Sequence, residues 1–175
     1  MNTKDITRTG VTVALLAVSA WVTVPFGPVP FTLQTLALAM IPAMLNRTCA
    51  IASVCCYVLL GAIGLPMFSS MQGGIGVLAG PTGGFLWGFI LGILAAMIVE
   101  RVLPERLSPF ARALVADVCM LLVAYVCGTV QLMAVAQMSL MPALMAAVIP
   151  FIIPDAVKLA CGARIGCAVA KAVGR

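Results

Sequence analysis

Long apolar runs, separated by short polar breaks, constrain this chain more than any other feature of its sequence. The runs cover residues 9–24, 31–45, 49–63, 85–99, 111–136 and 139–172. A helix of roughly 20 apolar residues spans the hydrocarbon core of a bilayer. Only 9% of the 175 residues are charged, against about 25% in a soluble domain. We therefore predict an all-α integral membrane protein, with about six transmembrane helices forming a single domain over residues 1–175.

The positions of lysine and arginine predict how the bundle is oriented. Basic residues lie before the first run, in the breaks after the second and fourth runs, and near the end of the chain: Lys4, Arg8, Arg47, Arg101, Arg106, Arg112, Arg164, Lys171 and Arg175. The other three breaks contain none. Because short cytoplasmic connections are enriched in basic residues, both termini are expected in the cytoplasm.

The break at residues 64–84 is long, uncharged and rich in glycine. On the orientation predicted above it lies outside the cell. Loops longer than about 12–15 residues are usually functional or disordered, and the apolar residues in this one argue against disorder. We expect an ordered loop folded down over a site.

An acid and a base, Asp155 and Lys158, stand three residues apart in a segment that is otherwise apolar. Residues with this spacing share one face of a helix. Ionisable groups at membrane depth are costly and usually face a bundle interior or a wet cavity, so the pair is a candidate recognition site. Asp155 follows Pro154, which suits the first turn of a helix, where the helix dipole favours a carboxylate. The alternative is an ion pair that only neutralises its own two charges.

Asp117 is the other charged residue expected deep within a span. It lies five residues beyond Arg112, about two turns from the predicted cytoplasmic end. We expect it to be a structural carboxylate held by a partner.

The remaining chemistry-bearing residues do not suggest catalysis. The chain has no histidine, so neither a Ser–His nor a Cys–His arrangement can form, and we expect no enzyme, metal site or cofactor. Seven cysteines fall in apolar segments and are expected to be small buried hydrophobes: Cys49, Cys55, Cys56, Cys119, Cys127, Cys161 and Cys167.

Small residues recur along the first run. Gly10 and Ala14 are four residues apart, and Ala17 follows about one turn later. This spacing lets another helix approach closely, although an ordinary lipid-facing helix would also accommodate it.

Four motifs occur in a fixed order along the chain: Pro28-Val29-Pro30-Phe31-Thr32-Leu33-Gln34-Thr35-Leu36, Leu60-Gly61-Ala62-Ile63-Gly64-Leu65-Pro66, Gly80-Pro81-Thr82-Gly83-Gly84-Phe85 and Asp155-x-x-Lys158. In order and distance they resemble the BioY family, the biotin-binding subunits (S components) of energy-coupling-factor (ECF) transporters. The resemblance covers essentially the whole chain. It implies six helices with the vitamin held near the outer face.

The resemblance also implies which residues contact the ligand. Asp155 and Lys158 match the acid and the lysine that bind biotin in the family. Gln72 falls where an amide side chain precedes the Gly-Gly of the long loop, so Gln72 and Gly73 are expected at the site. Leu86 stands where some members have an arginine.

Three further residues complete the candidate site, namely Thr82, Phe85 and Tyr125. Phe85 and Tyr125, together with Trp87, are candidates for apolar walls, although aromatic residues serve core or lipid packing equally well.

The function implied by the resemblance is high-affinity binding of biotin in the bacterial plasma membrane. An associated membrane coupling protein and cytoplasmic ATPases would then deliver the vitamin into the cell, with Gly10 and Ala14 packing against the coupling protein. Two alternatives remain: an S component for another small vitamin, since fold does not determine ligand, or a structural subunit with a buried ion pair.

Overall fold

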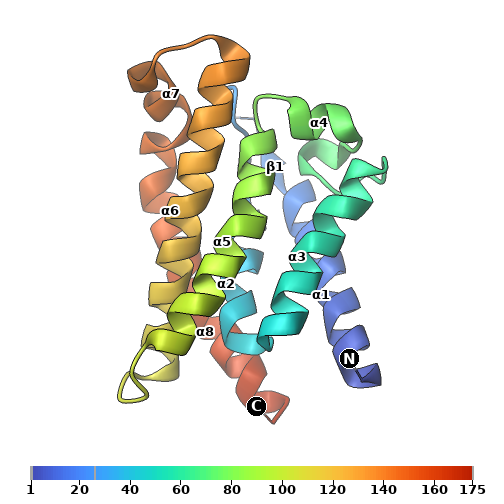
Figure 1. Cartoon of the computed structure of the whole chain (residues 1–175), viewed down its shortest axis with the longest axis vertical. Coiled ribbons are helices and arrows are strands. Elements are labelled where there is room, and N and C mark those ends of the chain that lie inside the picture. Colours follow the sequence, from blue (N-terminus) through green and yellow to red (C-terminus); the bar gives the residue numbers. More distant parts are fainter. Residues whose placement is uncertain (1, 26, 175) are drawn as a thin grey trace.

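The protein is a bundle of helices running along one axis, described for residues 2–25 and 27–174 by a computed structural model (Figure 1). The bundle consists of α1 (Thr3–Trp21), α2 (Gln34–Met44), α3 (Arg47–Ala62), α5 (Gly83–Val102), α6 (Pro109–Ala136) and α8 (Ile152–Ala172). Within the described residues, three stretches are long and apolar enough to cross a membrane: Gly83–Val102, Pro109–Ala136 and Leu140–Ala172. Helices α2 and α3 are shorter but also apolar. The predicted all-α membrane bundle is confirmed.

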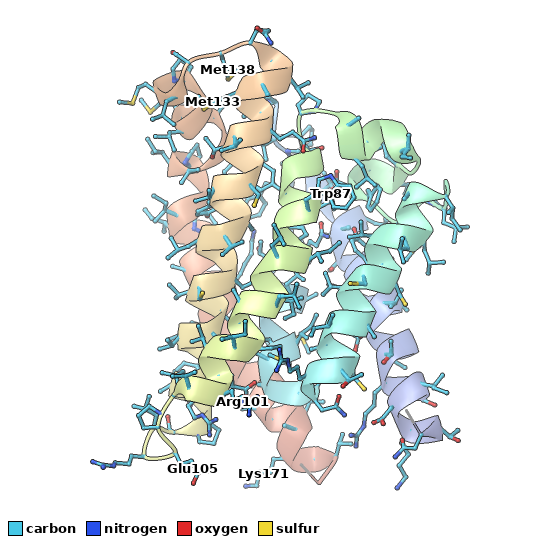
Figure 2. All side chains as sticks on the ribbon, viewed as in Figure 1. Trp87, Arg101, Glu105, Met133, Met138 and Lys171 are labelled. Carbon is cyan, nitrogen blue, oxygen red and sulfur yellow. The ribbon has the colours of Figure 1, made fainter. Side chains whose placement is uncertain are left out.

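The two ends of the bundle differ in chemistry. Both termini lie at the same end (Figure 1), and Figure 2 shows Arg101, Glu105 and Lys171 near that end. Met133 and Met138 lie at the opposite end (Figure 2), where the short helices α4 (Ile75–Ala79) and α7 (Leu140–Ala147) are also found (Figure 1). The molecule thus has a charged end and an uncharged end.

Several helices begin earlier than the apolar runs predicted, because polar residues cap them. The Asn2 side chain accepts from the Asp5 N–H at 2.9 Å, and the Asp5 carboxylate accepts from the Asn2 N–H at 3.3 Å. This reciprocal capping starts α1 at Thr3. Asn46 caps α3 and Ser108 caps α6 in the same position, each with one side-chain acceptor. The predicted starts at residues 9, 49 and 111 were therefore too late; that of α5 at residue 85 was two residues late.

The proline-rich break contains a short antiparallel pair of strands, β1 (Thr23–Val24) and β2 (Phe31–Thr32). The prediction had extended the first helix to Val24 and begun the second at Phe31. Both boundaries were wrong, because these residues pair with one another across the break. The pairing places Phe31 and Thr32 immediately before the start of α2.

Glycines allow the closest helix contacts. Helix α5 packs along α6, and α2 packs along α8. A Cβ on Gly88 would stand 2.7 Å from the Ala124 Cα, and one on Gly162 would stand 2.6 Å from the Leu36 carbonyl oxygen. Close backbone approach at small residues is the main source of packing between helices in lipid, so these seams hold the helices that surround the site.

The last apolar run, residues 139–172, is divided. Helix α7 ends at Ala147, the 3-10 turn η2 (Ile149–Phe151) follows, and α8 then begins at Ile152. Residues 139–149 therefore form a separate short helix, and α8 starts inside the bundle with Asp155 in its first turn, as predicted.

The glycine-rich loop is ordered, as expected. It contains the 3-10 turn η1 (Ser69–Met71) and helix α4. The Trp21 indole donates to the Pro66 carbonyl at 2.7 Å, and the Tyr57 hydroxyl donates to the Met67 carbonyl at 2.9 Å. On the other side, the Gln131 amide donates to the carbonyls of Leu78 and Gly80. Side chains of α1, α3 and α6 thus hold the loop in place.

The cysteines only partly follow the prediction that all are buried. All seven are free, but Cys49 alone is fully buried, whereas Cys56 and Cys161 are exposed on the outside of the bundle. The remaining four are half-buried. A thiol is apolar enough to face lipid as easily as protein, so position on the helix decides its burial.

Candidate ligand-binding site

A cavity lies between the ordered loop and the beginnings of α2, α5 and α8, with α6 forming another wall. Its polar lining consists of Thr32, Gln34, Thr35, Ser69, Thr82, Tyr125, Asp155 and Lys158. Aromatic side chains supply much of the rest: Phe68, Phe85, Phe89 and Phe151. Pockets for small ligands are built in this way, from mostly apolar walls and a few placed polar groups.

The two charges of the cavity are joined to each other. Lys158 Nζ lies 2.8 Å from Asp155 Oδ1, and the two residues are 6% and 2% exposed. The three-residue spacing on α8 therefore brings both heads to one place, as the sequence predicted. The pair carries no net charge, which lowers the cost of burying it.

Two further donors converge on the Asp155 carboxylate from other helices. The Thr35 hydroxyl of α2 donates to Oδ1 at 2.9 Å, and the Tyr125 hydroxyl of α6 donates to Oδ2 at 2.7 Å. Charge-assisted hydrogen bonds of this kind are short and strong. The carboxylate is consequently held in one orientation by three separate helices.

Aromatic rings support Lys158 from the strand side. Its Nζ stands 3.8 Å from the centroid of the Phe31 ring, a favourable position for a cation over a π-face. Phe31 in turn stacks on Phe151, with ring centroids 6.2 Å apart. The strand pair β1–β2 thus positions a ring that the apolar pattern had assigned to a helix.

Most of the residues expected at a ligand site line this cavity. Thr82, Phe85 and Tyr125 do so together with the charged pair, and so does Leu86. The Phe85 ring fits because position 128 is glycine: a Cβ there would overlap the ring. Gln72 and Gly73 are exposed and lie outside the lining. The Gln72 backbone instead closes the η1 turn, where its carbonyl accepts from the Phe68 N–H.

Trp87 does not form a wall of the cavity. It is 47% exposed on the outside of α5, away from the face that carries Leu86 and Phe89. Its suggested alternative role, packing against lipid, is consistent with this position. Each residue turns a helix by about 100°. Phe85 and Trp87 are two residues apart, so their side chains point to nearly opposite faces of α5.

Asp117 differs from the prediction that a partner holds it. The residue is fully buried on α6. Among the described residues, neither of its carboxylate oxygens has a hydrogen-bond partner. Sequence reasoning failed here because it assumed that a buried carboxylate must be paired, whereas no described side chain reaches hydrogen-bonding geometry with it.

Sequence reasoning missed Gln34 and Thr35 as residues of the cavity, and Phe31 as the ring that lies against Lys158. A signal existed, since Gln34 and Thr35 are polar residues at the start of an apolar run. Their direction toward the cavity depends on the strand pair that precedes α2. No local sequence pattern predicts that direction.

The small residues of α1 separate into two faces. Gly10 and Ala14 are exposed, and a Cβ on Gly10 would meet nothing within 4 Å. Ala17 is buried toward the bundle instead. Gly10 and Ala14 therefore leave a shallow strip on the outer surface of α1.

No group of three or more histidine, cysteine or acidic residues is arranged for a metal ion within residues 2–25 and 27–174. The cavity offers hydrogen-bonding side chains, one ion pair and aromatic surface.

Comparison with known proteins shows the family to which the chain belongs. The model of the BioY family matches residues 1–175. The chain belongs to the BioY family. The "Biotin transporter BioY" of Thermotoga maritima is 38% identical over 162 residues, which cover 93% of each chain. The "Biotin transporter BioY2" of Lactococcus lactis is 32% identical over 175 residues, covering 98% of this chain and 94% of the relative.

A solved structure has the same fold. It is described as the S-component for biotin from an ECF-type ABC transporter, and it superposes with a TM-score of 0.88 at 20% identity over 98% of this chain and 95% of its own. The expected family and S-component fold are confirmed. BioY is a family of membrane transporters and not of enzymes, so the membrane location and the absence of an enzymatic role are confirmed as well.

Proposed function

We propose that this chain is the biotin-binding subunit of an ECF-type importer. The family membership and the named relatives support a biotin S component. The observation that carries the proposal is the Asp155–Lys158 pair on the wall of an aromatic-lined cavity.

The chemistry of the cavity suits this vitamin. Biotin offers two ureido N–H donors, one ureido oxygen, an apolar bicycle and a carboxylate tail. The Asp155 carboxylate accepts from ureido N–H groups, and the Lys158 ammonium donates to an oxygen of the ligand. Phe68, Phe85 and Phe89 supply apolar surface for the bicycle.

The placement of the pair favours this role over that of a purely structural ion pair. A buried ion pair that only neutralises its own two charges also gains from further hydrogen-bond donors, but it needs no cavity beside it. In this chain the pair and its two hydroxyl donors line a cavity. The ligand therefore meets charges whose positions are already set, which reduces the ordering cost of binding.

Calorimetric titration of the purified protein with biotin tests the proposal. The parent should bind tightly, and Asp155→Asn and Lys158→Ala should each lose at least about tenfold in affinity, the value of one charge-assisted contact. Asp117→Asn is the matched control, because it alters a buried carboxyl outside the cavity and should bind as the parent does. Absence of biotin binding, or mutants that bind as well as the parent, would refute the site, and binding of another vitamin instead would favour the alternative ligand.

We further propose that the strip formed by Gly10 and Ala14 packs against a membrane coupling protein, which acts with cytoplasmic ATPases. The strip is exposed and free of large side chains, as close helix packing in lipid requires. Gly10→Leu or Ala14→Trp should abolish co-purification with the coupling protein while biotin binding stays intact. Val126→Trp, on the outer face of α6, is the control. Unchanged co-purification of the α1 variants would count against this surface.

The orientation proposed for the importer puts both termini in the cytoplasm. It rests on the basic residues near the end that carries the termini. Reporter fusions at the C-terminus, active only on one side of the membrane, test it directly. A reporter active outside the cell would reverse the orientation.

A further inference from the structure

Gln34 has a buried amide whose NH2 group forms no hydrogen bond with the described part of the protein. It is the first residue of α2, is 5% exposed and lines the cavity. Its Nε2 has no hydrogen-bond partner among the described residues. The Tyr57 hydroxyl, whose own hydrogen goes to the Met67 carbonyl, lies near the Gln34 side chain. Its oxygen does not meet the distance and angle of a hydrogen bond from Gln34 Nε2.

The contacts that Asp155 makes within the protein do not include Gln34. The two Asp155 oxygens accept from Lys158, Thr35 and Tyr125. The Gln34 amide is a donor, so it adds to this set nothing that the network lacks. A buried donor left without an acceptor is a loss to stability, and most such groups in folded proteins are paired.

We propose that Gln34 is a specificity-determining residue of the ligand site, which donates a hydrogen bond to an acceptor oxygen of the bound molecule. The inference rests on the proposed function, in which the ligand is biotin. Biotin carries acceptor oxygens on its ureido ring and on its carboxylate tail, and either one satisfies the amide. Binding then pairs a donor that has no partner among the described residues of the protein.

Gln34→Met tests the proposal because its two expected effects have opposite signs. Methionine has a similar shape but no donor, so biotin affinity should fall by about tenfold. The ligand-free protein should meanwhile melt about 2–4 °C higher, because an unpaired buried amide is gone. A residue with a purely structural role would lower the melting temperature, and loss of affinity with lower stability would therefore overturn the proposal.

Thr129→Val is the matched control. Thr129 is also buried with an unpartnered hydroxyl, but it lies on α6 outside the cavity lining. The variant should gain thermal stability in the same way and bind biotin as the parent does. Gln34→Glu is a second variant, which keeps the shape and replaces the donor by an acceptor; its affinity should fall further than that of Gln34→Met.

Titration with biotin methyl ester identifies the oxygen involved. If Gln34 donates to the ureido oxygen, Gln34→Met weakens biotin and the ester by the same factor. If it donates to the tail, the ester loses less than the acid, because a neutral ester is the weaker acceptor. Both results support a ligand contact, whereas undiminished affinity of Gln34→Met for both ligands would overturn it. Failure of the parent protein to bind biotin would instead refute the proposed function.

Discussion

Asp155 and Asp117 are two buried carboxyl groups in the same bundle with opposite surroundings. They are 2% and 0% exposed. Asp155 faces a cavity and accepts from three side chains, whereas Asp117 has no hydrogen-bond partner in the described part of the chain. Both carboxyl groups are therefore buried, and they differ in the hydrogen-bond donors around them. In this protein a set of donors brought together from separate helices, and not the presence of an acid in an apolar helix, distinguishes the proposed recognition site.

The physical consequence is that the two groups should respond to mutation in opposite directions. Removing one partner of a buried charged pair leaves the other charge uncompensated. Removing an unpaired buried polar group removes its desolvation penalty and leaves no partner without a hydrogen bond. Substitutions at the two positions therefore test the contrast.

The largest effect is expected at Asp155. Asp155→Leu leaves the Lys158 ammonium buried without its partner, which should destabilise the fold by about 3–5 kcal/mol. Thermal unfolding of the purified protein without ligand measures the change. A melting temperature equal to that of the parent would mean that the pair is not held in the bundle as described.

Tyr125→Phe should have the next largest effect. It removes the donor to Asp155 Oδ2, a hydrogen bond to a charged group worth about 1.5–3 kcal/mol. Both thermal stability and biotin affinity should fall, because the carboxylate loses the contact that fixes its orientation. An affinity that is unchanged would show that this hydroxyl serves folding alone.

Asp117→Leu should raise stability instead of lowering it. Leucine fills a similar volume, and the unpaired carboxyl, whose burial costs about 1–3 kcal/mol, is removed. Biotin affinity should stay the same, because Asp117 is outside the cavity lining. A clear loss of stability would mean that the carboxyl has a partner, and the contrast with Asp155 would fail.

The smallest effect is expected from Thr35→Val. Asp155 Oδ1 loses one donor but keeps Lys158 at 2.8 Å, so the cost should be about 1 kcal/mol. Combining Thr35→Val with Tyr125→Phe should cost more than the sum of the two, since the carboxylate would then be held from α8 alone. Strict additivity in a double-mutant cycle would argue against a coupled network.

Much of the fold was accessible from the sequence because its signals are local. Runs without charge predict spans, and the spacing of Asp155 and Lys158 predicts a shared helix face. Helix ends were predicted less well. Asn2 and Ser108 extend their helices into polar segments by capping, and the strand pair at Thr23–Val24 and Phe31–Thr32 shortens two others.

The site was predicted only in part, because the contacts that form it are not local in the sequence. Asp155, Lys158, Thr82, Phe85 and Tyr125 were expected there, largely because the sequence resembles a known family. Gln72 and Trp87 were expected nearby, and the structure places both outside the cavity. Sequence position alone does not tell which side of a loop or helix faces inward.

The sequence by itself determined that this is a membrane bundle and that an acid and a base share one face of its last helix. Only the tertiary structure decided what they meet there. Thr35 and Asp155 are 120 residues apart along the chain and hydrogen-bond at 2.9 Å. Asp117 is no less buried, yet no side chain in the described ranges donates to it. Such contacts depend on how separate helices are rotated and packed, because a hydrogen bond requires its two atoms to approach within about 3 Å.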